Sequence, residues 1–455
     1  MAQAEPGPAG LVDRRMALAR EWDDLVEQVR KVEGFDDFLR PPSLASLLPA
    51  ASGGPVVVVN VSQWRCDALI VTKDGVRNRH LPDLTLRQAT EQANTYLRTL
   101  HDAELAGHNH QVAKDAVDGD AEPTPAAIRA QSRAAAAMMK AERRTDDMLR
   151  SLQVWLWDCI AEPVLDELGL DLVPPSGTPW PRLWWCPTGP LTLLPIHTAG
   201  HHGETAGDGT PHTVLDRVVS SYTPTLRALL EARAVRTAAD HRMTRSNDTS
   251  HADFDEEDGA RMLVVAVGDA PGQPWLHNVA AERDVLTALF PPERRTLLEG
   301  PDATLRAVDE QLARHRWVHF SCHGDQDLAE PSRGGLLLYD GMLTISDISA
   351  RQFRGDFAGL SACKTAVGGI NLPDEAITLA AALHYTGYRH VVAALWSVDD
   401  ATAAQVFSAV YGDITDEGRL RPDDAAPALH SIVRALRDDA PDEPRIWTPF
   451  THIGP

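Results

Sequence analysis

The fold of this chain is decided by two short stretches, Val318-His-Phe-Ser-Cys-His-Gly324 and Gly359-Leu-Ser-Ala-Cys-Lys-Thr365. Each begins as a largely apolar run, typical of a buried strand, and ends in residues that can react. The reactive residues are His323 in the first stretch and Cys363 in the second. If both strands belong to one parallel sheet, their carboxyl ends meet at one edge, which is where such sheets carry their chemistry. The sequence therefore predicts that His323 and Cys363 are neighbours in space.

These two residue types form a known chemical pair. A cysteine attacks a carbonyl carbon as thiolate, and a nearby imidazole takes its proton and later protonates the leaving amine. Gly324 has no side chain, so its backbone N–H can approach a substrate carbonyl oxygen. Together with the N–H of Cys363 it would form an oxyanion hole.

The surrounding sequence alternates between apolar runs and helical patterns, which predicts an α/β fold with a mostly parallel sheet flanked by helices. The strands expected here are Met262–Val267, Trp317–Ser321, Asp356–Ala362 and Val391–Trp396. The helices expected here are Val279–Phe290, Thr304–His315, a helix capped by Asp374 that runs to Tyr385, and Ala401–Tyr411.

The first 144 residues read as an N-terminal, mainly helical accessory region, followed by one large domain over 145–455. The accessory region is expected to contain a helix to about Arg40, a strand pair at a sheet edge (Pro55–Val61 and Asp67–Thr72), a helix over Leu86–Leu105 and a loop over Asp115–Pro125. A further long helical region covers Pro125–Leu170. Two polar stretches, near 200–209 and 236–259, are expected to be flexible insertions.

The composition of the chain narrows the classes of function that it can have. The chain has 455 residues and a formal net charge of -22, which argues against nucleic acid and anionic membrane partners. The apolar runs are too short to span a bilayer, and Met1–Arg15 lacks the apolar core of a secretory signal. The five cysteines are scattered without a CxxC pair, so neither a disulfide framework nor a thiolate zinc site is indicated. These features predict a cytoplasmic protein.

An ordered series of motifs resembles the CHAT family, caspase-like domains related to separases. Any one motif is weak, but their order over most of 145–455 is specific. The motifs are Leu183-Trp-Trp-Cys-Pro-Thr-Gly-Pro-Leu-Thr-Leu-Leu-Pro195, Ser221-Tyr-Thr-Pro-Thr-Leu226, Val264-Val-Ala-Val-Gly-Asp269, the His323-Gly324 strand, Leu336-Leu-Leu-Tyr-Asp-Gly-Met-Leu-Thr344, Ser361-Ala-Cys-Lys-Thr365, Leu395-Trp-Ser-Val-Asp-Asp400 and Trp447-Thr-Pro-Phe450.

The resemblance implies a caspase-haemoglobinase fold and a cysteine endopeptidase. Position by position, His323 is the acid–base, Cys363 the nucleophile, and Gly324 an oxyanion donor. No metal or cofactor is required. The expected partners are a specific protein substrate and an activating or recruiting protein, in a bacterial defence or signalling setting. The chain lacks the tetratricopeptide repeats that often accompany such domains, which leaves its way of recruiting a substrate open.

The Leu-Trp-x-Val-x-Asp pattern resembles a separase segment that lines the pocket for the residue before the scissile bond. Asp399 or Asp400 would then favour Arg or Lys in that pocket, because a carboxylate pairs with a basic side chain. Asp327 is a weaker candidate for the same cleft. The alternative for the aspartate pair is capping of the helix over Ala401–Tyr411, which Asp also does well.

Three alternatives stay open at this point. Cys363 taken alone could be a buried structural thiol, the domain could be an inactive scaffold that acts through protein partners, and the same dyad could serve a small-molecule hydrolase or transferase. Cys322 is interpreted as a packing residue, because strand geometry turns it away from His323. His319 is expected to fill the sheet face or to orient a neighbour. A metal site made from His315, His319, Cys322 and His323 has little support. The remaining histidines of interest, His197, His201 and His202, are expected to be solvated.

Overall fold

The computed structural model describes residues 8–32, 35, 38–119, 122–175, 177–205, 211–234, 261–273, 275–325, 330–362 and 378–455. The chain divides into two compact units, Met1–Pro49 and Ala50–Pro455. The first unit holds the helix α1 (Pro8–Arg30) and the short helix α2 (Leu44–Leu47), whose first turn is capped by the Ser43 side chain. The helix predicted to reach about Arg40 thus already ends at Arg30.

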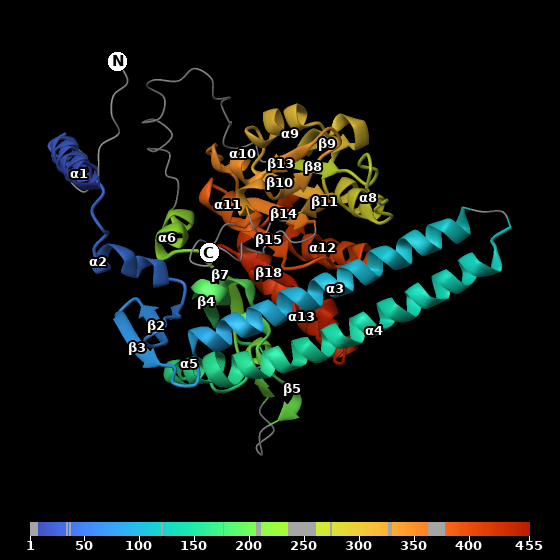
Figure 1. Cartoon of the computed structure of the whole chain (residues 1–455), viewed down its shortest axis with the longest axis horizontal. Coiled ribbons are helices and arrows are strands. Elements are labelled where there is room, and N and C mark those ends of the chain that lie inside the picture. Colours follow the sequence, from blue (N-terminus) through green and yellow to red (C-terminus); the bar gives the residue numbers. More distant parts are fainter. Residues whose placement is uncertain are drawn as a thin grey trace. The chain divides into compact units, whose positions relative to one another are not determined.

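The second unit is built on an 11-stranded sheet in the order β3-β2-β1-β4-β7-β18-β15-β14-β10-β8-β9 (Figure 1). Its strands are β1 (Val56–Asn60), β2 (Asp67–Thr72), β3 (Gly75–His80), β4 (Arg182–Pro187), β7 (Val219–Tyr222), β8 (Met262–Ala266), β9 (Arg295–Glu299), β10 (Trp317–Ser321), β14 (Phe357–Ser361), β15 (His390–Ala394) and β18 (Phe450–Ile453). Three neighbouring pairs, β1–β2, β2–β3 and β15–β18, are antiparallel, and the other neighbours are parallel. The mostly parallel sheet is therefore as predicted.

Strands β15, β14, β10, β8 and β9 all run in one direction. We call the edge at which they end the carboxyl edge. Strands β1, β4, β7 and β18 run the opposite way, because β18 is antiparallel to β15. The reversal at β18 divides the sheet into two parallel halves.

Helices cover both faces of the sheet. Alternation along β8 shows why: Leu263 and Val265 join the apolar cluster on one face, whereas Met262 and Val264 join the cluster on the other. The helices of this unit are α3 (Leu86–Asp118), α4 (Pro125–Leu156), α5 (Glu162–Leu168), α6 (Leu226–Arg233), α8 (Val279–Leu289), α9 (Leu305–Leu312), α10 (Ile345–Ser349), α11 (Leu379–Tyr385), α12 (Asp400–Ile414), α13 (Ala425–Asp439) and α14 (Pro444–Trp447). The first face is covered by α9, α10, α11 and parts of α3 and α4, and the second by α8, α12 and α13.

The strand pair predicted in the N-terminal region lies at the sheet edge, as expected, and β3 adds a third strand outside it. Because β1 pairs in parallel with β4, these strands continue the main sheet. The domain boundary expected near residue 144 stays a prediction, and residue 144 lies inside α4.

Helices α3 and α4 form a long antiparallel hairpin (Figure 1). Each begins with a threonine cap, Thr85 and Thr124, and Pro125 occupies the first turn of α4, where its missing N–H costs nothing. The loop predicted over Asp115–Pro125 is shorter than expected, because α3 continues to Asp118 and Gly119 follows it. The helical region predicted over Pro125–Leu170 is confirmed as α4, a π-helical turn (Trp157–Ala161) and α5.

The polar stretch near 200–209 is partly regular. Gly200–Thr205 forms strand β5, which pairs with β6 (Pro211–Thr213). Residues 206–210 and the stretch 236–259 lie outside the described residues. The expectation that His197 is solvated is wrong: its ring is buried, with Nδ1 3.0 Å from Tyr222 Oη and Nε2 3.1 Å from the Thr448 carbonyl. Burial lowers the pKa of His197 to about 4, so the ring is neutral at pH 7.

The other two histidines of this stretch also have protein partners. His201 Nε2 lies 2.7 Å from Asp158, and His202 Nε2 lies 2.9 Å from the Thr198 carbonyl. Burial lowers the pKa of His202 to about 4. The polar composition of the stretch therefore reflects contacts with α4 and the π-helical turn Trp157–Ala161, which sequence composition alone does not reveal.

Candidate active site

The two decisive strands are neighbours in the sheet. β10 and β14 pair in parallel, with Ser321 opposite Ser361 at their carboxyl ends. His323 follows Ser321 by two residues, and Cys363 follows Ser361 by two residues. The described ends of the two strands, at Ser321 and Ser361, therefore lie at the same edge of the sheet.

His323 and Gly324 belong to a small second sheet. Strand β11 (His323–Asp325) pairs with β12 (Gly335–Leu337), which pairs with β13 (Met342–Thr344). Gly335 is needed there because a Cβ atom would lie 2.1 Å from the Leu343 carbonyl oxygen. The small sheet holds His323 half-buried just beyond β10.

Several predicted site residues are not described. Cys363 and Asp327 lie outside the described residues, as does Asp374, the predicted cap of the helix that ends at Tyr385. That helix, α11, is capped in the structure by Thr378, whose side chain accepts a hydrogen bond from the Ala381 N–H.

Asp399 caps helix α12. Its carboxylate accepts a hydrogen bond of 3.2 Å from the Thr402 N–H, and the residue is exposed. This is the capping role that the sequence offered as the alternative to a pocket role. Asp400 is the first residue of α12.

A buried polar network, missed by sequence reasoning, lies beneath the carboxyl edge. We call it the Glu282 network: Glu282 from α8, His319 from β10, Ser361 from β14 and Tyr411 from α12. Glu282 Oε2 lies 2.9 Å from His319 Nε2, and Glu282 Oε1 accepts a hydrogen bond of 2.6 Å from Ser361. Tyr411 Oη lies 3.2 Å from His319 Nδ1.

The chemistry of these groups orients the network. A carboxylate only accepts, so His319 Nε2 donates to Glu282, and the Tyr411 hydroxyl is the partner of the other ring nitrogen, Nδ1. Burial, with the nearby Glu282 charge, raises the pKa of Tyr411 well above its usual value, so the hydroxyl keeps its proton. The prediction that His319 fills the sheet face or orients a neighbour is thus confirmed, and Glu282 is what it holds.

Gly359 makes room for this network. A Cβ atom at Gly359 would lie 2.5 Å from Tyr411 Oη and 2.9 Å from His319 Nδ1. Only a glycine therefore lets α12 and β10 approach β14 closely enough for the ring and the hydroxyl to meet. The Gly-Leu-Ser sequence before Cys363 is thus explained by contacts on the buried face of β14.

The Glu282 network forms one side of a pocket at the carboxyl edge. The pocket walls are mainly apolar and come from α8, the ends of β10, β14 and β15, and α12. Its lining residues are Leu276, Val279, Glu282, Ser321, Cys322, Leu360, Ser361, Ala362, Ala394, Trp396, Val398, Ala403, Phe407 and Phe450. A carboxylate that is only 4% exposed, in an otherwise apolar pocket, is a strong attractor for a positive charge.

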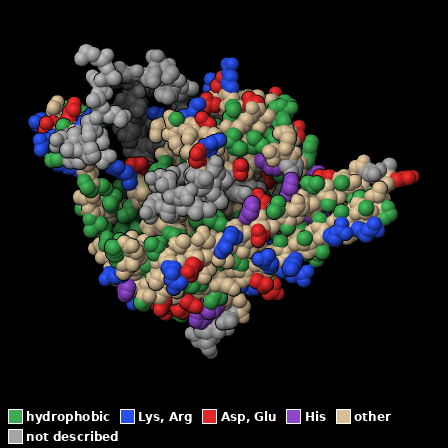
Figure 2. Space-filling view, in the orientation of Figure 1, with side chains coloured by type: hydrophobic (Ala, Val, Ile, Leu, Met, Phe, Trp, Pro, Cys, Tyr) green, Lys and Arg blue, Asp and Glu red, His purple; other side chains and the backbone are tan. Residues whose placement is uncertain are grey.

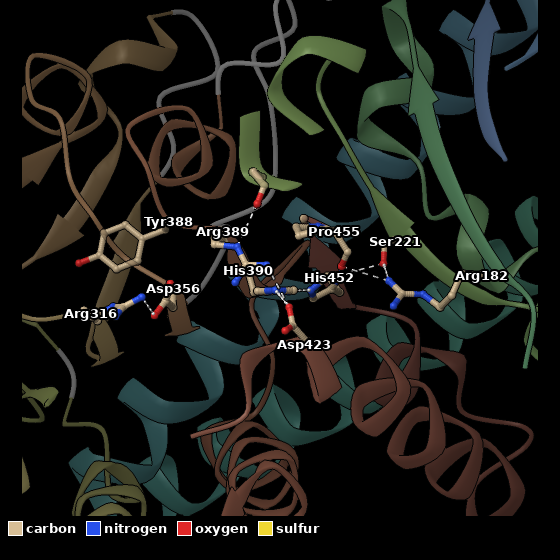
Figure 3. Close-up of polar contacts among 12 residues, drawn as sticks. Arg182, Ser221, Arg316, Asp356, Tyr388, Arg389, His390, Asp423, His452 and Pro455 are labelled. Carbon is tan, nitrogen blue, oxygen red and sulfur yellow. Dashed lines mark hydrogen bonds and ion pairs between the residues drawn. The ribbon is translucent and has the colours of Figure 1, made fainter. Parts of the chain in front are cut away.

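A second buried network lies at the opposite end of β15 (Figure 3). We call it the Asp423 network: Asp423, His390, His452, Ser221 and Arg182. Starting from the carboxylate, the successive distances are 3.0 Å to His390 Nε2, 3.1 Å from His390 Nδ1 to His452 Nε2, 2.8 Å from His452 Nδ1 to Ser221 Oγ, and 2.7 Å from Ser221 Oγ to Arg182. Every donor points toward Asp423, which fixes both imidazole tautomers.

The described cysteines are structural. Cys66, Cys159, Cys186 and Cys322 are buried, and none of them forms a disulfide bond with another described cysteine. Burial raises the pKa of Cys159 to about 11 and that of Cys186 to about 12, so neither forms a thiolate at neutral pH. The interpretation of Cys322 as a packing residue is confirmed by its place in the apolar core. The described histidines His315 and His319 are likewise held by protein groups, His315 by the Gln311 carbonyl and Thr296.

The large, mostly parallel sheet and the helices that cover both of its faces define a caspase-like α/β fold. A family model described as CHAT domain matches residues 150–455, about two thirds of the chain. This chain therefore belongs to the CHAT family, a family of caspase-like proteases, as the motif series predicts.

Solved structures agree with this fold. The crystal structure of the Saccharomyces cerevisiae separase–securin complex at 2.6 Å resolution matches with a TM-score of 0.54 and 10% sequence identity, covering 90% of this chain and 30% of that chain. A second structure of the same complex, at 3.0 Å resolution, matches with a TM-score of 0.52 and 9% identity over the same shares. This chain thus spans less than a third of the length of the separase chain it resembles.

A comparison with curated proteins found no match. Within the described part of the chain, every helix is too short or too polar to cross a bilayer.

Proposed function

We propose that this protein is a cysteine endopeptidase that hydrolyses a peptide bond of a specific protein substrate. Cys363 is the nucleophile and His323 the acid–base, and the backbone N–H groups of Gly324 and Cys363 form the oxyanion hole. The reaction proceeds through an acyl-thioenzyme without a metal or an organic cofactor. The setting we propose is the reducing cytoplasm, in bacterial defence or signalling.

The parallel register of β10 and β14 carries this proposal. Ser321 and Ser361 are opposite each other, and the proposed dyad residues each follow by two positions. A second observation adds support: the other four cysteines are buried in the core, which leaves Cys363 as the thiol for chemistry.

Each step is an ordinary proton transfer or carbonyl reaction. His323 takes the Cys363 thiol proton, and the thiolate sulfur bonds to the substrate carbonyl carbon. The tetrahedral oxyanion is held by the two N–H groups until the C–N bond breaks and His323 protonates the leaving amine. Water, deprotonated by His323, then cleaves the thioester and releases the new carboxylate.

The pocket beside Ser361 and Ala362 supports cleavage after a basic residue. Trp396 and Phe407 offer apolar surface to the aliphatic stem of Arg or Lys. Glu282 supplies a buried negative charge deeper in the same pocket. Asp399 is engaged as a helix cap. Of the predicted aspartates, Asp400 therefore remains the candidate for binding a basic side chain at the pocket rim, and Asp327 is the weaker candidate.

We also propose that a protein partner controls the activity. The separase in the solved structure is in complex with another protein, securin. A cytoplasmic protease that was always active would be damaging, so we propose that the present chain is active only when a partner protein permits it.

The test measures cleavage of fluorogenic peptides by the wild type, Cys363→Ala and His323→Ala. Each substitution is expected to lower kcat by at least about 10³-fold while the unfolding midpoint stays within error. An exposed-histidine control, His101→Ala, should cleave like the wild type. Equal cleavage by wild type and Cys363→Ala would overturn the proposal and favour the inactive scaffold.

A further inference from the structure

The α3–α4 hairpin carries a row of basic side chains on its solvent side. Five exposed residues of α4 make up this basic stripe: Arg129, Arg133, Lys140, Arg143 and Arg144. Their spacing places them within an arc of about 100° on the helix surface. Figure 2 shows Lys and Arg side chains gathered along the hairpin.

The charge of the stripe is not neutralised by neighbours. Among the described residues, none of these five side chains forms an ion pair, whereas Arg150 farther along α4 pairs with Asp147 and Arg445 pairs with Asp146. The stripe is therefore a concentrated positive charge on a chain whose net charge is -22. Two small exposed residues within it, Ala136 and Ala137, leave room for another chain to approach.

The other helix of the hairpin contacts the wall of the candidate pocket. The Tyr96 ring packs against Trp396 edge to face, with 5.9 Å between ring centres. Ser397 donates a hydrogen bond of 3.1 Å to Glu104. Trp396 lines the pocket and Ser397 follows it, so α3 contacts the segment that shapes the pocket.

We propose that the basic stripe binds an acidic segment of a partner protein, and that this binding is transmitted through α3 to the pocket at Trp396. The stripe is about 22 Å long, from 15 residues at 1.5 Å rise. That length fits about six or seven extended residues or four helical turns of a partner. Only the second part of this inference, the transmission to the pocket, rests on the proposed peptidase function.

An acidic protein segment fits better than RNA. The stripe offers five charges in a strongly negative chain, which would repel the rest of a long polyanion. A short acidic segment meets the local stripe and little of the remaining surface.

The binding test uses the full chain carrying Cys363→Ala, so that no cleavage interferes. The probes are a fluorescein-labelled 16-residue helical peptide with five glutamates at the spacing of the stripe, its glutamine counterpart, and a 16-nucleotide single-stranded RNA. One variant replaces all five stripe residues with glutamine. The matched control removes five exposed positive charges elsewhere: Lys73, Arg79, Arg306, Arg314 and Arg419.

The stripe variant is expected to bind the glutamate peptide at least about tenfold more weakly than the charge-matched control does. Equal affinities for the two variants would overturn the proposal, as would tighter binding of the RNA than of the glutamate peptide. Neither result depends on catalysis, so failure of the peptidase proposal would be seen separately.

The transmission test uses the chain with Cys363 intact. The glutamate peptide is expected to raise kcat/KM for a basic fluorogenic peptide at least about threefold, and Glu104→Gln is expected to reduce this rise without weakening peptide binding. An unchanged rise in Glu104→Gln would overturn the coupling through α3. If the peptide binds but neither chain cleaves substrate, the peptidase proposal fails and the binding site stands.

Discussion

The molecule contains two carboxylate–imidazole networks on the same face of one sheet, and they differ in how the carboxylate is neutralised. In the Asp423 network the carboxylate is 74% exposed and is bound by both His390 and Arg389. In the Glu282 network the carboxylate is 4% exposed, and its partners are an imidazole and a hydroxyl. The first therefore has a neighbouring positive charge and water, while the second has neither.

This difference in exposure and neutralisation indicates which of the two networks is structural. The Asp423 network links β4, β7, β18 and β15 in a closed chain of donors and acceptors, which is what stability requires of buried polar groups. The Glu282 network faces a pocket beside Ser361 and Ala362, so its charge remains available to a ligand. A buried charge kept without a cation is typical of a functional site.

The first test of this contrast between the two networks is to lower the pH and measure the loss of stability. Burial lowers the pKa values of His390 and His452 in the Asp423 network, and it lowers that of His384, a ring on α11 outside the network that interacts electrostatically with both, to about 4. An unfolded imidazole has a pKa of about 6.5, so below that pH the unfolded chain binds more protons than the folded one. The stability present above about pH 6.5 is therefore lost as the pH falls toward 4, with about 3 kcal/mol from His384 alone.

Urea unfolding at about pH 7 and about pH 5 measures this loss. The free energy of unfolding should fall steadily between the two. A flat profile would mean that the three rings are protonated in the folded state or already hydrated, and that the Asp423 network does not require neutral histidines.

Replacing His452 should break the structural network without touching the pocket. His452→Ala leaves the Ser221 hydroxyl proton without its acceptor and His390 Nδ1 without its donor, and it opens a cavity, which together cost about 3 kcal/mol. The free energy of unfolding by urea measures this cost. The exposed-residue control His101→Ala should change it by less than about 0.5 kcal/mol. A large loss of kcat/KM in folded His452→Ala would contradict the division between the two networks.

Neutralising Glu282 is expected to have the opposite effect, a change in substrate cleavage at the pocket. With the proposed basic specificity, Glu282→Gln is expected to lower kcat/KM for an arginine peptide about 30-fold, roughly 2 kcal/mol, because a buried ion pair with the substrate is lost. A norleucine peptide should be cut almost as before. Glu310→Gln, an exposed carboxylate on α9, is the matched control. Equal losses on both peptides would show that Glu282 only supports the fold.

The smallest expected effect concerns the contact between Gly359 and Tyr411. Gly359→Ala should destabilise the protein by about 1 to 3 kcal/mol through the clash with Tyr411 Oη and His319 Nδ1. Removing the hydroxyl with Tyr411→Phe should relieve part of that clash. A double-mutant cycle on urea unfolding is therefore expected to give a coupling of about 1 kcal/mol. Strict additivity would mean that the alanine methyl group is accommodated elsewhere.

The local sequence pattern was sufficient to predict the helices and strands and the two strand ends beside the candidate site. The apolar runs before His323 and Cys363 are strands β10 and β14, because a continuous apolar run bounded by polar residues suits a strand buried on both faces. The motif series identified the family over 150–455. The predictions were wrong at the ends of elements. Helix α3, for example, continues past the acidic residue Asp115 and is capped by Gly119. Helix ends are hard to predict because they depend on small differences in capping and packing.

Local sequence patterns predict two buried strands that are followed by a histidine and a cysteine, because strand patterns and residue types are local. The packing of the folded chain determines that Glu282, on a helix 37 residues before His319, holds that imidazole ring and lines the pocket. It likewise decided that Asp399 caps α12 and that Asp423, His390, His452 and Ser221 form one line. These roles depend on which side chains meet across packed layers, and no single segment encodes its distant partners.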